Sequence, residues 1–238
     1  MATAPHPTVG PIRRRHGSGP AVLAILILVI AVGAASLLVI RADAPEQGSG
    51  VPTAETRDLP PFTGVDLAAA NVVRVHVGRH QRVVVHADDN LLSQVTTRVV
   101  GGRLVVGARG GFSTGAPMHV DVTVPSVRLI ALSGAGTITL EGVHAARLTV
   151  DLSGAGVIRA SGHAGRLAAM LSGAGKVDLD RLVAAAAQVV VDGGGLMTVR
   201  ATGSLDATVR GFGTVRYAGD PGRVVRTITG AGVVVAAK

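Results

Sequence analysis

The chain has 238 residues and a formal net charge of +8, from 23 Lys and Arg against 15 Asp and Glu. Glycine supplies 33 residues, whereas there are only 3 Phe, 1 Tyr and no Trp, so any core must be built from Val, Leu, Ile and Ala. The absence of cysteine excludes a disulfide framework, a thiolate metal site and a lipid-anchored cysteine.

The amino-terminal part contains one long apolar segment. Residues 1–20 are rich in Pro, Gly and Ser, include the basic run at 13–16 (RRRH), and predict a disordered tail. Residues 21–40 read AVLAILILVIAVGAASLLVI without a charge, and at about 1.5 Å per residue they match a hydrocarbon core of about 30 Å. Because the arginines precede this segment, the positive-inside rule places the tail in the cytoplasm and the later chain outside. We therefore predict one transmembrane helix at 21–40, acting as a signal anchor.

A cleaved signal peptide is the alternative interpretation of residues 21–40. Small residues at 32–34 (VGA) and 42–44 (ADA) are of the kind that signal peptidase needs. The apolar stretch exceeds the roughly 7 to 15 residues of a signal core, which favours the retained anchor. Under either interpretation the remainder of the chain is exported, as a membrane-anchored or a secreted domain.

Alternation typical of strands begins after residue 61. The preceding residues 41–60 (RADAPEQGSGVPTAETRDLP) have no apolar periodicity and predict a linker. Period-two alternation then appears in four segments separated by Gly-containing turns: 72–77 (VVRVHV), 82–87 (RVVVHA), 103–108 (RLVVGA) and 119–124 (HVDVTV). We expect residues 61–125 to form the first strands of an all-β domain that extends over 61–238.

A repeat follows in residues 126–238. The sequence LSGAG at 132–136 recurs at 152–156 and 171–175. Aligned on the serine, six copies start at steps of 20, 19, 20, 18 and 19 residues, at Ser133, Ser153, Ser172, Asp192, Arg210 and Thr229. Apolar residues recur two positions apart on both sides of each copy, as in Leu148, Val150 and Leu152 before a corner and Ile158 and Ala160 after one. Each copy is thus predicted to be a strand, a tight glycine corner, a second strand and a turn.

A unit of about 19 residues cannot bury its apolar face alone, but stacked copies share one core and pair their backbones at about 4.8 Å. The repeat therefore predicts a parallel β-helix, or β-solenoid, of about six coils. The corners need the conformations of glycine and small side chains, because each coil places its corner directly on the previous one. Arg210 and Phe212 depart from this rule and predict a distorted or outward-pointing corner.

These residues resemble the bacterial exported domains known as GIN domains, described as heads of auto-transporter adhesins. The similarity lies in FTGVDL at 62–67, VPSVRLIALSGAG at 124–136, the repeated LSGAG, and GTVRYAGDP at 213–221. It covers roughly residues 61–236. The resemblance implies an exported bacterial β-solenoid without established catalytic residues and with an adhesin-like role.

Charged side chains are expected on one outer face of the solenoid. One outward column holds Thr139, Arg159, Asp178, Thr198 and Arg216, and a second holds Glu141, Ser161, Asp180 and Arg200. Arg159 beside Asp178, and Asp180 beside Arg200, predict an ion-pair ladder worth about 0.2–1 kcal/mol per pair. The alternative is a polysaccharide lyase, in which carboxylates hold Ca²⁺ and an arginine acts as base. Because only Asp178 and Asp180 converge, we favour the ladder.

Histidines form two groups along the chain. His76, His80 and His86 lie in the first strands, and His144 and His163 lie at equivalent turns of successive coils. Zinc sites use three or four ligands at characteristic spacings, and no acid or cysteine completes either group. We therefore interpret these histidines as surface residues and predict no metal site.

Net charge, aromatic content and the absence of known motifs limit the partners that the domain is expected to bind. Residues 61–238 contain 18 Lys and Arg and 11 Asp and Glu, a net charge of 18 − 11 = +7, scattered through the copies. Nucleic acid is not expected as a partner, because the domain is exported and lacks aromatic stacking residues. No Ser-His-Asp pattern or phosphate-binding loop is present, since the glycine corners lie between strands. Weak attraction to anionic envelope polymers follows from the net charge.

We therefore predict a single-pass, extracytoplasmic β-solenoid that acts as a binding or structural, adhesin-like module at the bacterial cell envelope. We assign it no catalytic, cofactor-binding or metal-binding residues and no cofactor, and the ligand-binding residues stay unassigned. The expected partners are the membrane and either an envelope polysaccharide or another envelope protein. The alternatives are an envelope polysaccharide-degrading enzyme and a scaffold that docks a protein partner through an uncapped solenoid edge.

Overall fold

The computed structural model describes residues 45–115 and 118–237, which belong to one compact unit beginning at Pro45. The predicted tail at 1–20 and the predicted transmembrane segment at 21–40 lie outside the described residues. Within the described part, no helix has the length and apolar character needed to cross a membrane. The single helical element in that part is the 3₁₀ turn η1 (Asp89–Leu91), and strands dominate the remainder. The all-β prediction is confirmed.

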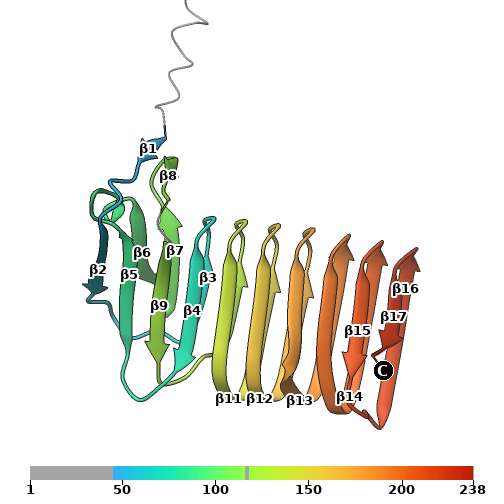
Figure 1. Cartoon of the computed structure of the whole chain (residues 1–238). Helices are drawn as coiled ribbons and strands as arrows, with labels where there is room; N and C mark the ends of the chain where they lie inside the picture. The colour runs from blue at the N-terminus through green and yellow to red at the C-terminus, as the bar shows by residue number, and fades with distance from the viewer. Residues whose placement is uncertain (1–44, 116–117, 238) are drawn as a thin grey trace, which may run out of the picture. The chain divides into compact units, whose positions relative to one another are not determined.

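The carboxyl-terminal half is a β-solenoid, in which strands follow one another in chain order (Figure 1). Each coil pairs in parallel with the next, so that Ile138 lies beside Ile158 and Leu148 beside Leu167. The strands are β10 (Leu129–Leu132), β11 (Thr137–Leu152), β12 (Val157–Leu171), β13 (Lys176–Gly193), β14 (Leu196–Gly211), β15 (Thr214–Ala218), β16 (Arg223–Gly230) and β17 (Val233–Ala236).

Two faces of one wound sheet enclose the core. What we call the first face consists of the strand parts that follow each corner, at 137–141, 157–160, 176–179, 196–200, 214–218 and 233–236. The second face consists of the parts that precede the next corner, such as 147–152 in β11 and 167–171 in β12. The six predicted corners bound about five turns, because the chain after Thr229 adds only the short strand β17. The expectation of about six coils is corrected accordingly.

The stack also contains two earlier layers that the repeat does not show. Strand β3 (Gly64–Leu67) pairs in parallel with β10, and β4 (Val72–Val77) pairs in parallel with β11. Below them, β7 (Arg103–Ala108) pairs in parallel with β3, and β9 (His119–Val124) with β4. The layers are therefore stacked out of chain order. The coil formed by β3 and β4 lies between the layer formed by β7 and β9 and the first coil of the repeats.

Antiparallel strands close the amino-terminal end of the stack. Strand β5 (Arg82–Asp88) pairs with β9, and β6 (Val95–Val100) pairs with β7. Strand β2 (Pro52–Arg57) pairs with the outer edge of β5, and two further short strands, β1 (Glu46–Gln47) and β8 (Phe112–Ser113), pair with each other. The opposite end lacks such a cap in the described chain, because β16 pairs only with β14 and β17 only with β15.

The prediction that residues 41–60 form a linker needs correction for β2. Its residues are largely exposed, so the strand shows no apolar alternation. Backbone pairing with β5 holds it instead, together with a hydrogen bond from Nη2 of Arg57 to the carbonyl oxygen of Leu92 at 2.9 Å. An edge strand needs only its backbone groups to pair, which explains why the side-chain pattern does not reveal it.

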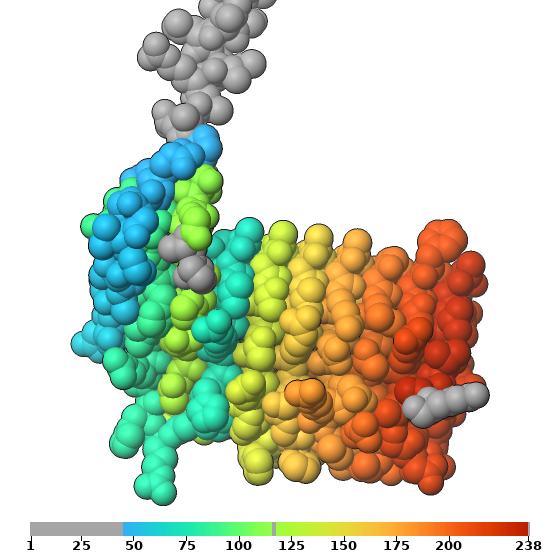
Figure 2. Space-filling view, viewed as in Figure 1, coloured from blue at the N-terminus to red at the C-terminus, as the bar shows by residue number. Residues whose placement is uncertain are grey.

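The core is the apolar interior between the two faces, and successive coils fill it in register. From outside, the coils of the repeat lie side by side in chain order (Figure 2). The predicted inward positions of the repeats are buried, including Leu148, Val150 and Leu152 with no exposed side-chain surface. Ala236 is the exception, since it lies exposed at the open end. Phe212 replaces the small corner residue and is 80% exposed, which confirms the outward-pointing corner.

Candidate functional site

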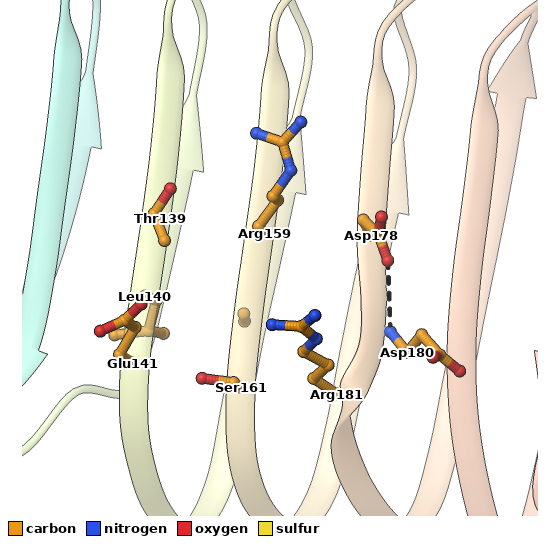
Figure 3. A pocket seen from close by; sticks show the side chains of 9 residues that line it. Thr139, Leu140, Glu141, Arg159, Ser161, Asp178, Asp180 and Arg181 are labelled. Atoms are coloured by element: carbon orange, nitrogen blue, oxygen red, sulfur yellow. Dashed lines mark hydrogen bonds between the residues drawn. The ribbon is translucent and has the colours of Figure 1, made fainter.

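The first face carries a polar groove across β11, β12 and β13 (Figure 3). We call it the first-face groove, and its volume is about 480 Å³. Three consecutive coils contribute its lining: Thr139, Leu140 and Glu141 from β11, Arg159, Ala160 and Ser161 from β12, and Asp178, Asp180 and Arg181 from β13. The groove is therefore a product of coil stacking and of the outward columns predicted from the repeat.

A β-bulge in β13 shapes this groove. Arg159 lies beside Asp178, but the next paired residues are Ser161 and Arg181, so β13 contains one residue more than β12 there. A larger shift follows against β14, where Val183 is the residue beside Arg200. Such bulges re-aim side chains. The first predicted column is in register along all the coils, whereas the second is interrupted twice, between Glu141 and Ser161 and again at Asp180.

The ion-pair ladder forms only in part. Arg200 donates from Nε to the carbonyl oxygen of Asp180 at 2.8 Å and from Nη2 to its Oδ1 at 3.1 Å, so this predicted pair is present. Asp178 instead pairs with Lys176 of its own strand, with 3.1 Å between Nζ and Oδ2. Arg159 lies next to Asp178 in the sheet without an ion pair to it.

Two arginines of the groove remain free to bind a ligand. Among the described residues, neither Arg159 nor Arg181 has an ion pair or a hydrogen bond through its guanidinium group, and both residues are exposed. Arg181 extends from β13 toward Ser161 on β12 (Figure 3). Guanidinium groups bind carboxylate, sulfate or phosphate oxygens with two parallel hydrogen bonds. The groove thus combines two free cationic groups with hydroxyls from neighbouring coils.

The acids of the groove are not arranged as a calcium site. Glu141 joins Asp178 and Asp180 in the lining. The sequence placed Glu141 in the outward column of Asp180, but only Asp178 and Asp180 were expected to converge. However, their carboxylates do not form a group within 4.8 Å of one another, and Asp178 and Asp180 are each paired with a cation. Calcium needs six to eight oxygen ligands around one point. The arrangement therefore lacks the cluster that a calcium-dependent lyase would need.

The polar surface continues from this groove toward the cap. A second hollow of about 400 Å³ shares Thr139 and Glu141 with the first and adds Arg74, His76 and Asp121. Both hollows lie on the first face, because β4 and β9 extend that sheet beyond β11. A polar strip thus runs along the first face from β9 to β13, across several layers.

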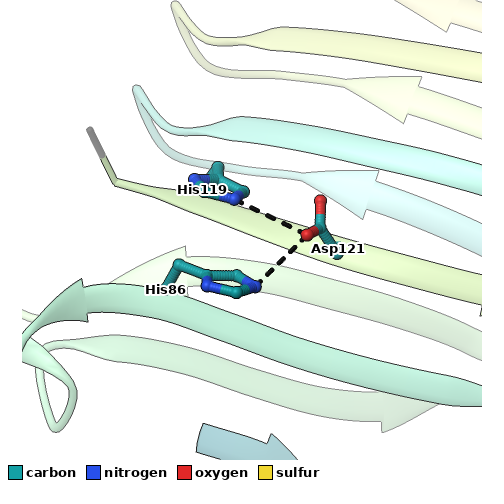
Figure 4. Close-up of side chains that lie close together, drawn as sticks. All are labelled: His86, His119 and Asp121. Atoms are coloured by element: carbon teal, nitrogen blue, oxygen red, sulfur yellow. Dashed lines mark ion pairs between the residues drawn. The ribbon is translucent and has the colours of Figure 1, made fainter. Parts of the chain in front are cut away.

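The histidines are grouped differently from the sequence expectation. His144 and His163 are neighbours on successive coils, as predicted, with ring centroids 5.5 Å apart in an edge-on arrangement. His86 lies against His119 and Asp121 of β9, at the margin of the first face (Figure 4). Sequence reasoning missed His119 and Asp121. The outward alternation of HVDVTV at 119–124 places both on one face, but the strand opposite could not be inferred.

Comparison with known proteins gives one family and several solved structures. The family model described as "Putative auto-transporter adhesin, head GIN domain" matches residues 61–221. A solved "putative adhesin" from Bacteroides fragilis NCTC 9343 is 20% identical, with a TM-score of 0.65 over 80% of this chain and 99% of its own. A solved "putative lipid binding protein" from Parabacteroides distasonis ATCC 8503 is 18% identical, with a TM-score of 0.50 over 82% of this chain and 100% of its own. At these identities the likeness shows the fold. Among curated proteins no significant match is found.

Proposed function

The chain belongs to the family described as auto-transporter adhesin head GIN domains, and on this premise we propose that it is an adhesin-like binding module of the bacterial cell envelope. Its ligand is an acidic polysaccharide, bound along the first-face groove. The family description, together with the solved neighbour named a putative adhesin, supports the binding role. The apolar segment at 21–40 and the basic run before it support a single membrane anchor, with the solenoid outside the cell.

One observation supports an acidic ligand above others. Arg159 and Arg181 come from neighbouring coils, about 4.8 Å apart along the stack, and their guanidinium groups have no partner in the described protein. A polymer with regularly spaced carboxylates could therefore bind one guanidinium group per coil. The scarcity of exposed aromatic residues disfavours neutral sugars, which are usually held by stacking on aromatic rings.

A non-catalytic role is part of this proposal. The carboxylates of Asp178 and Asp180 are neutralised by Lys176 and Arg200, so neither is poised as a metal ligand or a general base. A lyase would need a cluster of acids around one cation, and the three acids of the groove do not converge in that way. A binding groove requires no such convergence.

The test measures binding of the full chain, in mild detergent, to immobilised polygalacturonate at low salt and at 0.15 M salt. We expect saturable retention that persists at the higher salt, because groove contacts are screened less than diffuse attraction over a Debye length of about 8 Å. The double variant Arg159→Ala/Arg181→Ala should lose most of this retention. The matched control is Arg79→Ala/Arg98→Ala, which removes the same charge from two exposed residues of the cap.

The outcomes separate the candidate functions. An equal loss of retention in both double variants would show that net charge alone drives the interaction, and would contradict binding in the first-face groove. Shortening of the polymer that disappears in Asp178→Ala/Asp180→Ala would establish the polysaccharide-degrading enzyme instead. Absence of any retention would leave the scaffold interpretation, in which the partner is another envelope protein.

A further inference from the structure

We infer that His86, His119 and Asp121 form a binding site for one divalent transition-metal ion, with Zn²⁺ as the representative. The register of the cap creates this group. His86 of β5 lies directly opposite His119 of the antiparallel strand β9, and Asp121 follows two positions later on the same face. Residues two apart on one strand and a residue opposite them are the nearest neighbours that a sheet face offers.

The distances between potential ligand atoms suit a metal ion. Nε2 of His86 is 3.2 Å from Oδ2 of Asp121, and Nε2 of His119 is 3.5 Å from the same oxygen. The three residues each offer one ligand atom within 4.8 Å of the others, and no other such group occurs in the described part of the chain. With metal–ligand bonds of about 2.0–2.2 Å, tetrahedral geometry requires ligand atoms roughly 3.3 Å apart.

The two imidazole rings must turn for the ion to enter. They are stacked, with centroids 4.3 Å apart and planes at 8°, whereas a metal ion must lie close to the plane of each ring (Figure 4). The final side-chain torsion of histidine has a broad minimum, and both side chains retain solvent access, at 34% for His86 and 18% for His119. Both rings can therefore turn toward Asp121, and metal binding should disrupt the stack.

The surroundings favour this ligand set. Nη1 of Arg74 is 3.9 Å from Oδ1 of Asp121, so this arginine lies beside the oxygen that the two histidines do not contact. Oδ2 remains directed toward both imidazoles. Two imidazoles and one carboxylate suit Zn²⁺, Ni²⁺ or Cu²⁺ better than Ca²⁺ or Mg²⁺, which prefer oxygen ligands throughout. Three protein ligands leave a coordination position open to water or to a donor group of another molecule.

The site would be tested by calorimetric titration of Zn²⁺ into the full chain, purified in mild detergent without a histidine tag. We expect one equivalent to bind, with an affinity that decreases severalfold or more as the pH falls below about 6, because protonated imidazole cannot bind a metal. His119→Ala should weaken binding by about 100-fold or more. The double variant His144→Ala/His163→Ala is the matched control, because it removes the other histidine pair, and its affinity should be unchanged.

A second variant and a second readout keep the result independent of folding. Asp121→Asn preserves the shape of the side chain but removes its charge, so it should weaken Zn²⁺ binding by at least about 10-fold while the far-ultraviolet circular dichroism stays the same. Co²⁺ should show visible absorption bands that disappear in the same variant. Stoichiometric binding that survives both His119→Ala and Asp121→Asn would overturn the site. Absence of saturable Zn²⁺ binding at pH 7.5 would also overturn the site, and would show that His86 and His119 only contact the carboxylate of Asp121.

Discussion

Gly154 lies so close to Gly134 that a Cβ atom on Gly154 would be 1.9 Å from the carbonyl oxygen of Gly134. The next corner repeats the relationship, with 1.9 Å between a Cβ on Gly173 and the carbonyl oxygen of Gly154. Backbone therefore stacks directly on backbone at the corners, and the first glycine of each SGAG leaves no volume for a side chain. This contact explains why glycine holds the second position of the corner in all six copies of the repeat.

The first prediction concerns this contact. Gly154→Ala should lower the free energy of unfolding by about 3 kcal/mol, because the atom in the way is a backbone oxygen that cannot rotate aside. The corner would have to separate from its neighbours, which disturbs pairing on both sides. Urea unfolding followed by circular dichroism measures the change. A loss below about 1 kcal/mol would show that the corners can spread at little cost.

A second prediction uses a glycine in the same motif as its control. Gly194 occupies the position held by alanine in the SGAG copies, its φ is not in the left-handed region, and an added Cβ would have no atom within 4 Å. Gly194→Ala should therefore stabilise the chain by about 0.4–1 kcal/mol, because it reduces the freedom of the unfolded state. If urea unfolding instead shows that Gly194→Ala is less stable, the corner at Gly194 is not equivalent to the SGAG corners.

The repeat makes most of the solenoid predictable, because each coil obeys the same two constraints. Period-two apolar positions define which side chains are buried, and the glycine corners define where the chain turns. The coil of β3 and β4 could not be predicted from the repeat, because its corner at 68–71 reads AAAN and does not match SGAG. The carbonyl oxygens of Ala69 and Asn71 nevertheless lie against Gly134 and Gly136, so the backbone makes the same stacked corner with different side chains.

The third prediction tests the two faces of one strand. Leu171 has no exposed side-chain surface, whereas its neighbour Met170 points outward and is 44% exposed. Leu171→Ala should cost about 2–5 kcal/mol by removing buried methyl groups and leaving a cavity, whereas Met170→Ala should change stability by less than about 0.5 kcal/mol. Thermal or urea unfolding of both variants measures the difference. Similar values for the two would be inconsistent with the assigned core.

The fourth prediction concerns the bulge that shapes the first-face groove. Arg200 contacts both the backbone and the carboxylate of Asp180, and its side chain is 40% exposed. Arg200→Ala should cost about 1 kcal/mol, since exposed ion pairs contribute little and the hydrogen bond to the carbonyl contributes most of the effect. Arg216→Ala is the control: Arg216 is an exposed arginine of the neighbouring outward column without an ion pair in the described chain, and its removal should be nearly neutral. An equal effect of the two would show that Arg200 does not hold the bulge.

Candidate sites were harder to predict than the core, because they depend on register between distant segments. The outward column of Arg159 and Asp178 follows from the repeat, but the bulge that directs Arg181 into the groove arises from an extra residue in β13. Likewise, His86 is closer in sequence to His80 than to His119, and only the antiparallel pairing of β5 with β9 brings His86 and His119 together. A local sequence pattern predicts which side chains face outward, whereas the topology of the strands determines which residues become neighbours.

The fifth prediction addresses the charge next to the metal-binding residues. Arg74 is 60% exposed and reaches only to 3.9 Å from Asp121, so it orients the carboxylate weakly while adding a positive charge near the ion. Repulsion should therefore dominate, and Arg74→Ala should tighten Zn²⁺ binding about threefold at low salt, with a smaller effect at 0.5 M salt because exposed charges are screened. Arg74→Lys keeps the charge and should leave the affinity nearly unchanged. Weaker binding in Arg74→Ala would instead assign Arg74 the role of positioning Asp121, and calorimetric titration of the three chains distinguishes these outcomes.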